Sequence, residues 1–383
     1  MSTVYILGAG FSMPFGYPSS RHLLCKLNKF VLTHGAFDSE LKNKWERCWI
    51  ELGESKDDAV RCAFEGRNIE ELLTVLDFYQ KLKSNRFSDS ADEWASTMDT
   101  SGKGSVGKEN EKRFQRANAL SDKYTEHRDT LLKVLQAFFL VRHHQDHANW
   151  SDAEYNDLKR FAQRVQPGDT VLTFNYDALA ERALLACEKW APHDGYGFEV
   201  NLESKEDPCL CTAYSPVKVL HLHGFIGWYD GASAADPSSL DSDFLANLGC
   251  QCKPTDNINS KYPNIIAPSY IKTYVTHYWD GTKVAELWAK AIQAIQDSSK
   301  VVIIGYSLPE ADSAAMTLFL GISGKTVEVV NPNVPIERNI RNLLEQRCTF
   351  VYHSTGKFLW ENVPDYNLSS WLNEQDAQAT QCS

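Results

Sequence analysis

The stretch Val4-Tyr5-Ile6-Leu7-Gly8-Ala9-Gly10-Phe11-Ser12 decides how this chain is read. Its first four residues are large and apolar and predict a buried strand, and the glycines that follow at once predict a tight turn. Because Gly8 and Gly10 carry no Cβ, backbone NH groups of the turn could approach a phosphate closely, with a helix starting near Ser12 behind them. We expect a nucleotide cradle from Gly8 to Ser12, although an ordinary tight turn has the same pattern.

Composition bounds the size and surface of the protein. Its 383 residues are 43% hydrophobic, and no Pro- or Gly-rich linker separates two cores, so we expect a single α/β domain over residues 1–383. Lys and Arg number 39 against 50 Asp and Glu, a net charge of −11. Binding to nucleic acid or to an anionic membrane depends on basic surface, so the charge argues against both.

The start of the chain and its cysteines indicate a cytoplasmic protein. The sequence opens without a basic and apolar leader, and no apolar run reaches the roughly 20 residues of a membrane span. We expect the 10 cysteines to be reduced thiols. Cys209-x-Cys211 and Cys250-x-Cys252 leave a zinc site open as an alternative, but paired zinc thiolates usually have more residues between them, so no metal is expected.

Short β-branched runs recur along the chain, and most are apolar on both faces. They predict strands at residues 3–7, 169–174, 217–223, 263–267, 300–305, 326–330 and 349–353. Helical periodicity fills several gaps, and one apolar face comprises Val284, Leu287, Trp288, Ala291, Ile292 and Ile295. Alternating strands and helices predict an α/β fold, a doubly wound Rossmann-like parallel sheet with ligands at the carboxyl ends of its strands.

A long stretch, residues 8 to 168, separates the first two predicted strands. A single crossover needs far less, so we expect a large helical insertion after the first strand, at residues 22–165. It has a capping box at Asn68 to Glu71 and a strongly apolar helix from Leu131 to Leu140. Residues 84–112 are polar and predict a mobile loop, and residues 230–262 predict either a lid or a surface excursion.

Four blocks of this sequence resemble a known family. Gly8 to Ser12, followed by Gly16-Tyr17-Pro18 and Arg21, is similar to the sirtuin opening Gly-Ala-Gly-x-Ser, three residues, Gly-Ile-Pro-Asp-Phe-Arg. Thr173-Phe174-Asn175-Tyr176-Asp177 stands where sirtuins have Thr-Gln-Asn-Ile-Asp, and His223-Gly224 stands where they have His-Gly. The block from Ile303 to Asp312 looks like the Gly-x-Ser-Leu turn of the prokaryotic sirtuin-like family that hydrolyses NAD in anti-phage defence.

The resemblance implies an NAD site with catalytic roles for Asn175, His223 and Asp177. It implies that the residues that bind NAD are Gly8, Ala9, Gly10, Phe11, Ser12, Pro18, Arg21, Gly305, Ser307 and Asn331. NAD would be the substrate, and no metal would take part.

The chemistry of NAD cleavage suits these residue types. The pyridinium leaving group needs no acid, so the site must stabilise an oxocarbenium-like carbon and deliver a nucleophile. The Asn175 amide can orient a ribose hydroxyl and a water molecule, and histidine, with an ordinary pKa of about 6.5, can accept a proton. Each residue has a plain alternative: a turn for Asn175, a hydrogen-bonded core position for His223, and a helix N-cap for Asp177.

Neighbouring residues carry further expectations. His221 shares a strand face with His223, so it is either a packed residue that supports the site or half of a metal pair, for which no third ligand is evident. Ser307-Leu308-Pro309-Glu310 fits a capping box, yet Ser307 also follows a strand and can contact ribose or phosphate. Asn331 resembles the Asn that meets the adenosine side in sirtuins, and a plain turn is its alternative.

Two departures from sirtuins favour hydrolysis over deacylation. Ser19-Ser20-Arg21 lacks the aromatic residue that lies near the nicotinamide in sirtuins, so water could reach the reactive carbon more easily. The zinc ribbon and acyl-lysine groove that follow His-Gly in deacylases are not recognisable after Gly224. We therefore expect an NAD glycohydrolase (NADase) that releases nicotinamide and ADP-ribose and depletes NAD in anti-phage defence by abortive infection. The alternatives are a non-catalytic NAD or ADP-ribose sensor and an NAD-dependent protein deacylase.

An unrestrained NAD hydrolase would kill its host, and the family blocks leave no room for a separate sensor domain. We expect control by self-assembly into a homo-oligomer or by a separately encoded regulatory partner, such as a DNA-translocating ATPase or an Argonaute-like protein.

Overall fold

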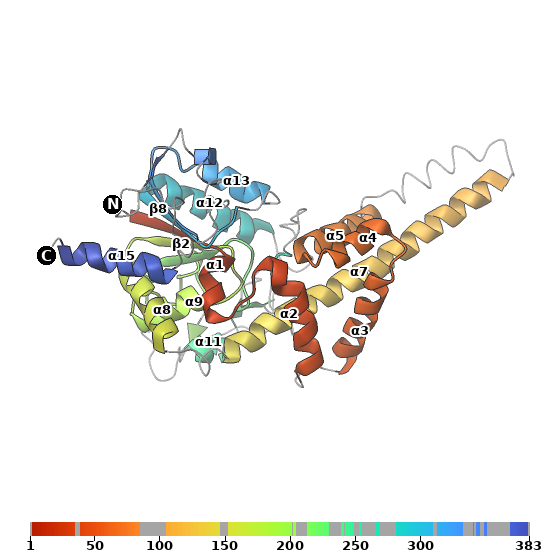
Figure 1. Ribbon diagram of the computed structural model, residues 1–383, viewed down its shortest axis with the longest axis horizontal. Helices are drawn as coiled ribbons and strands as arrows, with labels where there is room; N and C mark the ends of the chain where they lie inside the picture. The colour runs from red at the N-terminus through yellow and green to blue at the C-terminus, as the bar shows by residue number, and fades with distance from the viewer. Residues whose placement is uncertain are drawn as a thin grey trace. The chain divides into compact units, whose positions relative to one another are not determined.

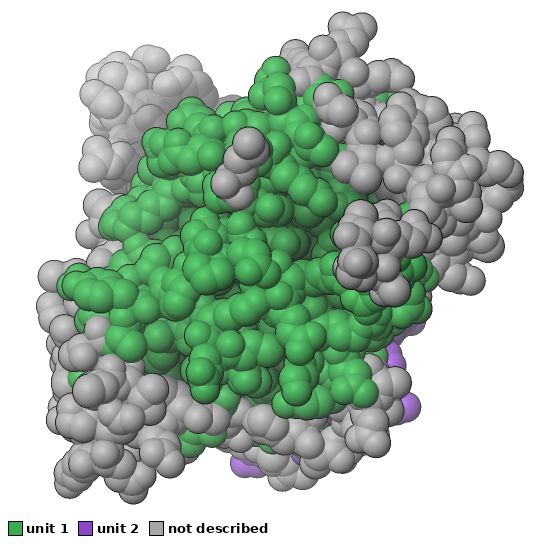
Figure 2. Space-filling model, turned by 90° about the vertical axis from the view of Figure 1, so that its left-hand side faces the viewer, with its two compact units in different colours: residues 1–19, 139–266, 273–383 green, residues 20–138, 267–272 purple. Residues whose placement is uncertain are grey.

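The computed structural model describes most of the chain. The described residues are 2–34, 39–84, 105–145, 152–200, 202–203, 213–229, 239–240, 242–248, 253–254, 265–267, 281–308, 312–331, 340, 342–344, 348–350 and 368–381. Close contacts divide the chain into two compact units, which Figure 2 colours separately. Unit 1 comprises residues 1–19, 139–266 and 273–383, and unit 2 comprises residues 20–138 and 267–272. The single domain predicted for residues 1–383 stays a prediction.

Six parallel strands form the main sheet of unit 1 (Figure 1). Their order is β10 (Thr349–Phe350), β9 (Thr326–Val330), β8 (Ser298–Ile304), β1 (Ser2–Leu7), β2 (Thr170–Thr173) and β4 (Lys218–His221). Counted along the chain from the β4 edge, this is the order 3-2-1-4-5-6 of a doubly wound Rossmann sheet. The predicted fold class is confirmed.

β1 lies at the centre of this sheet. It pairs with β2 from Val4↔Thr170 onward and with β8 as far as Leu7↔Ile304. The side chains from Val4 to Leu7 are buried, as expected for a parallel strand with both faces covered. Five of the predicted strands match observed ones with ends within two residues. The predicted strand at 263–267 is reduced, among the described residues, to an isolated bridge of Ile265 with Gly224.

Helices cover both faces of the sheet (Figure 1). α12 (Gly281–Asp297) and α13 (Ser313–Leu320) lie on one face, and α8 (Asp152–Arg164), α9 (Leu179–Ala186) and α15 (Leu368–Gln381) lie on the other. α12 buries Val284, Leu287, Ala291 and Ile295, as its periodicity predicts, whereas Ile292 is 41% exposed. The buried face of α12 contacts β1, β4 and β8.

Short elements complete unit 1. α1 (Ala9–Ser12) and the 3-10 helix η1 (Met13–Phe15) follow β1. The sequence predicts a helix that starts near Ser12, but α1 ends there, and η1 stops at Gly16, whose φ of 86° is left-handed. β3 (Leu202–Glu203) pairs with β7 (Lys253–Pro254), β5 (Trp228–Tyr229) pairs with β6 (Ser239–Leu240), and α11 (Ser242–Leu248) lies between β6 and β7 in sequence. Most of the predicted lid, residues 230–262, lies outside the described residues.

Unit 2 is built from helices. They are α2 (Ser20–Thr33), α3 (Ser39–Gly53), α4 (Asp58–Glu65), α5 (Ile69–Ser84) and the part of α7 (Ser105–Gln145) up to Phe138. Asn68 holds the start of α5, because its Oδ1 accepts from Glu70 N at 3.0 Å. Glu71 meets the side chain of Asn68 and not its backbone, since Asn68 Nδ2 donates to Glu71 Oε1 at 3.1 Å, so this contact differs from the predicted capping box.

The mobile loop predicted within the insertion differs from the structure at its end. α7 starts at Ser105, so the last residues of the predicted loop are helical, while residues 85–104 lie outside the described residues. The last helix before β2 is α8, which ends at Arg164, next to the predicted limit of the insertion at residue 165, and it belongs to unit 1. Among the described residues, no helix is long and apolar enough to cross a membrane.

Candidate functional site

The loops that follow β1, β2, β4, β8 and β9 lie at the carboxyl edge of the main sheet. The strand order reverses between β1 and β8, so the crevice at their ends is the topological switch point, where sheets of this kind bind ligands. Four of the predicted site segments follow these strands directly: the turn at Gly8, the loops at Asn175 and His223, and the turn at Gly305.

Two glycine turns interlock at the switch point. Gly8 N donates to Ile304 O at 3.0 Å, and Gly10 N donates to Gly305 O at 2.8 Å. A Cβ on Gly10 would lie 2.7 Å from the Cα of Gly305, and a Cβ on Gly305, whose φ is +63°, would lie 2.3 Å from Phe11 N. Glycine is required because the two backbones touch with no room for a side chain.

The same contacts occupy backbone donors of the predicted phosphate cradle. The NH groups of Gly8 and Gly10 donate to the β8 end, and Phe11 N donates to Gly8 O at 2.9 Å. Backbone packing therefore accounts for the glycines by itself, as in the plain-turn alternative. Ala9 is the exposed residue of this turn. Phosphate binding here stays a prediction.

Asn175 is buried two residues beyond β2, and its amide is held on several sides. Its Nδ2 donates to Gly8 O and to Ser12 Oγ, both at 2.9 Å. Its backbone N donates to Thr173 Oγ1 at 3.1 Å. Since a carbonyl oxygen only accepts, the group that faces Gly8 must be the NH₂ group. The Asn175 carbonyl oxygen, Oδ1, thereby has a fixed direction and can accept a hydrogen bond from a ligand or a water molecule.

Asp177 accepts a hydrogen bond from Ser12 in this structure. The Ser12 hydroxyl donates to Asp177 Oδ2 at 2.6 Å and accepts from Asn175, so the three side chains form one buried chain of hydrogen bonds. Asp177 Oδ1 accepts from Leu179 N at 3.2 Å, at the start of α9. The N-cap of α9 is Ala178, so Asp177 lies one residue before the predicted cap position and meets the helix start through Leu179 N. A catalytic role for Asp177 stays a prediction.

His221 supports the backbone of Asn175 from the neighbouring strand. Its Nδ1 lies 3.1 Å from Asn175 O, and its Nε2 is paired with the carboxylate of Glu181. Both side chains of this pair are 0% exposed. The His221 ring lies 3.9 Å from the ring of Phe225, centroid to centroid. A packed, supporting role for His221 is therefore what the structure shows.

His223, the last predicted catalytic residue, is paired with a carboxylate. Its Nε2 lies 2.9 Å from Asp312 Oδ2, and the two side chains are 10% and 0% exposed. Tyr306 also donates to Asp312 Oδ2, at 3.1 Å. The sequence did not single out Asp312 as a candidate site residue. The signal that could have found it is an aspartate placed before the apolar run Ala314-Ala315-Met316, as an N-cap.

Asn175 and His223, two of the three residues predicted to be catalytic, follow neighbouring strands. Thr173 pairs with His221 at the last register position of β2 and β4, and Asn175 and His223 each lie two residues farther on. Neighbouring strands run about 4.8 Å apart. The His223 ring also lies 4.9 Å from the ring of Phe174, the residue before Asn175. The structure therefore places Asn175 and His223 at the same edge of the sheet.

The remaining predicted residues are spread more widely. Asn331 follows β9 and donates to Tyr306 O at 3.3 Å, so it fastens the loop after β8. Ser307 is exposed in that loop, and Pro18 is half-buried before α2. Arg21 lies exposed in the first turn of α2, in unit 2.

The predicted capping box at Ser307 is wrong. α13 begins at Ser313, and its N-cap is Asp312, whose Oδ1 accepts from Ala315 N at 3.2 Å. Leu308 has a left-handed φ of 46°, which no helix interior tolerates, so no helix can run through that residue.

The two histidines of the possible metal pair contact different carboxylates. His221 is paired with Glu181, and His223 is paired with Asp312. Cys209, Cys211, Cys250 and Cys252 lie outside the described residues. Within the described part of the chain, no group of three or more His, Cys, Asp or Glu residues could hold a metal ion.

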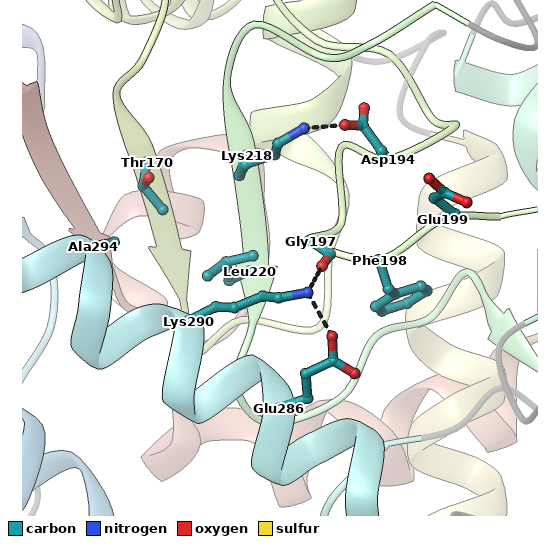
Figure 3. A pocket seen from close by; sticks show the side chains of 10 residues that line it. All are labelled: Thr170, Asp194, Gly197, Phe198, Glu199, Lys218, Leu220, Glu286, Lys290 and Ala294. Carbon is teal, nitrogen blue, oxygen red and sulfur yellow. Dashed lines mark hydrogen bonds and ion pairs between the residues drawn. The ribbon is translucent and has the colours of Figure 1, made fainter.

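A separate hollow of about 600 Å³ lies beside β4 (Figure 3). It is lined by Thr170 and Lys218, the first residues of β2 and β4, and by residues of α12. Its lysines are already paired, Lys218 with Asp194 and Lys290 with Glu286. Because it opens at the starts of these strands, it is distinct from the crevice at their carboxyl ends.

Comparisons with known proteins give matches only among solved structures. No protein-family model and no curated protein matches the chain. A crystal structure of Sir2 with the inhibitor EX-527, 2'-O-acetyl-ADP-ribose and a deacetylated p53 peptide is 12% identical, with a TM-score of 0.26 over 90% of this chain and 93% of that one. Sir2Tm bound to a propionylated peptide is 12% identical, with a TM-score of 0.26 over 90% and 92%. A structure on sirtuin substrate affinity is 14% identical, with a TM-score of 0.27 over 90% and 93%.

Proposed function

We propose that the protein is an NAD glycohydrolase, which releases nicotinamide and ADP-ribose from NAD. The observation that carries the proposal is the orientation of Asn175: its NH₂ group is held by Gly8 and Ser12, so its carbonyl oxygen is fixed at the switch point. The sequence blocks that resemble the sirtuin-like family support NAD as the ligand. The histidine and carboxylate pair at the same edge supports a hydrolytic reaction.

The reaction needs little covalent participation by the protein. The bond between C1′ and the pyridinium nitrogen breaks, its electron pair stays on nicotinamide, and a water oxygen bonds to C1′. The Asn175 carbonyl oxygen accepts a hydrogen bond from that water or from a ribose hydroxyl and so holds it in line. The released proton passes to His223 and then to solvent. Ser12 and Asp177 keep the Asn175 amide from rotating.

The other NAD contacts are assigned to the loops around this crevice. Ala9 is exposed at the start of α1, and Ser307 is exposed after β8, so both are accessible to the ADP-ribose half. Asn331 holds the loop that carries Ser307. Pro18 also belongs to the set that the resemblance implies, and the role of Arg21, which lies in unit 2, rests on the resemblance alone.

Nicotinamide release from NAD by the purified protein tests the proposal. The protein is incubated with NAD without any acylated peptide, and nicotinamide and ADP-ribose are separated by chromatography. We expect nicotinamide release by the wild type, either as its homo-oligomer or with its regulatory partner added. Under the same conditions His223→Gln should lose at least about 10²-fold, because glutamine cannot act as the base. His22→Gln, an exposed histidine of α2, is the control and should release nicotinamide at the wild-type rate.

Two other functions predict different results. A sensor module would bind NAD, seen by calorimetry, and release no nicotinamide. A deacylase would release nicotinamide only when an acylated peptide is added, and would yield the deacylated peptide. Either result would replace the proposed hydrolysis.

The proposal also includes a way in which NAD cleavage is kept under control. The cytoplasmic protein would deplete NAD in anti-phage defence, held inactive until it forms a homo-oligomer or meets a separately encoded regulatory partner, such as a DNA-translocating ATPase or an Argonaute-like protein. Light scattering coupled to gel filtration, with NAD cleavage measured across the fractions, tests this. A fully active monomer without any partner would contradict it.

A further inference from the structure

Asp312 is held in place independently of His223. Its Oδ1 accepts from Ala315 N at 3.2 Å, and its Oδ2 accepts from the Tyr306 hydroxyl at 3.1 Å. The Tyr306 ring in turn stacks on Phe174 at 4.3 Å and on Phe319 at 5.6 Å, between centroids. The carboxylate therefore has one orientation, set by a helix start and by a packed tyrosine.

This orientation presents an acceptor to His223 Nε2. A neutral imidazole carries one proton, and the ring nitrogen that faces a carboxylate is the one that keeps it. The other nitrogen, Nδ1, then has the lone pair. The same arrangement in other hydrolytic enzymes fixes the tautomer of the general base.

We infer that Asp312 is a positioning residue that holds His223 as the Nε2–H tautomer, so that Nδ1 is the atom that accepts the proton from water. This role rests on the proposed NAD hydrolysis. The proton taken from water goes to Nδ1, and the imidazolium formed is stabilised by the Asp312 carboxylate at Nε2.

Asp312→Asn separates this role from helix capping. Asparagine is as good an N-cap as aspartate, so its oxygen keeps the bond from Ala315 N and its NH₂ group takes the place of Oδ2. That NH₂ group donates to Nε2 and forces the His223 proton onto Nδ1. We expect kcat for nicotinamide release to fall by about 10²- to 10⁴-fold, with KM for NAD within about threefold of the wild type because Asp312 acts through His223.

The tautomer is read directly by ¹⁵N NMR of the histidine rings, recorded over a pH series so that the spectrum of the neutral imidazole is identified. His223→Gln assigns the resonance by its absence. We expect a protonated Nε2 in the wild type and a protonated Nδ1 in Asp312→Asn.

Asp57→Asn is a matched control. Asp57 caps α4 through Val60 N at 3.1 Å and accepts from the Tyr79 hydroxyl. These contacts match those of Asp312 with Ala315 N and Tyr306, but the proposed mechanism gives Asp57 no histidine to position. It should keep the wild-type kcat and the wild-type His223 tautomer. An unchanged tautomer in Asp312→Asn, or a loss of kcat no larger than in Asp57→Asn, overturns the inference. A wild type that cleaves no NAD, either as a homo-oligomer or with its regulatory partner added, defeats the proposed function instead, and the tautomer comparison still decides the role of Asp312.

Discussion

The amide nitrogen of Asn175 donates a 2.9 Å hydrogen bond to the carbonyl oxygen of Gly8, 167 residues earlier in the chain. This bond joins the loop after β2 to the glycine turn after β1. It also decides the direction of the amide, because the opposite orientation would set two oxygens against each other. Residues remote in sequence thus define a single polar site at the switch point.

Asn175→Asp keeps the shape of this side chain but removes its hydrogen-bond donors. A carboxylate cannot donate to Gly8 O or Ser12 Oγ, so the oxygen that faces the ligand loses its fixed direction. We expect kcat for nicotinamide release to fall at least about 10²-fold and the protein to lose about 1–3 kcal/mol of stability. Initial rates and urea unfolding measure the two effects.

Asn373→Ala is the control for that variant, since Asn373 lies exposed on α15 and accepts from Arg160. It should keep the wild-type rate. If Asn175→Asp kept at least half of the wild-type kcat, the assigned role of the amide would be wrong.

Gly305→Ala should be far more destabilising than a comparable glycine substitution elsewhere. Both Gly305 and Gly168 have positive φ, +63° and +88°, but a Cβ at Gly305 meets backbone at 2.3 Å, whereas at Gly168 it meets nothing within 4 Å. We expect Gly168→Ala to lower the free energy of unfolding by about 1–2 kcal/mol, from left-handed strain alone. Gly305→Ala should lower it further, because the added methyl group must also push the two loops apart. Urea midpoints of the two variants, measured side by side, make the comparison. Equal losses would show that the interlocked turns can part freely.

Replacing both His221 and Glu181, which form a buried pair, should reduce the rate of nicotinamide release more than it reduces stability. Glu181→Ala leaves a buried imidazole without its carboxylate and should cost about 3–5 kcal/mol. The double change of His221→Phe and Glu181→Leu should recover most of that loss, because apolar residues replace buried ion pairs with little penalty. Its nicotinamide release should stay reduced, since Asn175 O has lost the contact from His221 Nδ1. Full recovery of both properties would remove any functional role for the pair.

His127 should make unit 2 less stable in mild acid. Burial lowers the pKa of His127 below its ordinary value of 6.5, and the carboxylate of Glu51 opposes that shift. The unfolded chain therefore takes up the proton first, so stability falls as pH drops below about 6.5 and levels off below the folded pKa. The urea midpoint of the wild type should decrease between pH 7.5 and pH 5.5 more than that of His127→Gln, and Glu51→Gln should steepen the decrease. A midpoint in His127→Gln that follows pH as the wild type does would contradict the assignment.

The sheet could be predicted from the sequence because its strands carry local signals. Val4 to Leu7 and Val301 to Ile304 are apolar on both faces, which only a covered parallel strand requires. The partners of the site residues could not be predicted in this way. Glu181 lies 40 residues from His221, and Asp312 meets His223 only through the packing of α13 on the sheet.

The error at Ser307 has a similar origin. Ser307-Leu308-Pro309-Glu310 satisfies every local rule for a helix start, but the chain turns left-handed at Leu308 and the helix starts after Asp312. Gly305, just before this loop, lies against Gly10 from a distant part of the chain, and rules for local helix starts do not include such a contact.

The central position of β1 has a consequence for the synthesis of the protein. Its two neighbours begin at Thr170 and Ser298, so β1 is completed on one side only after nearly 300 further residues have been made. At roughly 5–20 residues per second, a ribosome needs roughly 15–60 s to go from the end of β1 to the end of β8. Throughout that time an apolar strand of the nascent chain lacks one neighbour, so we expect chaperones to bind this segment during translation.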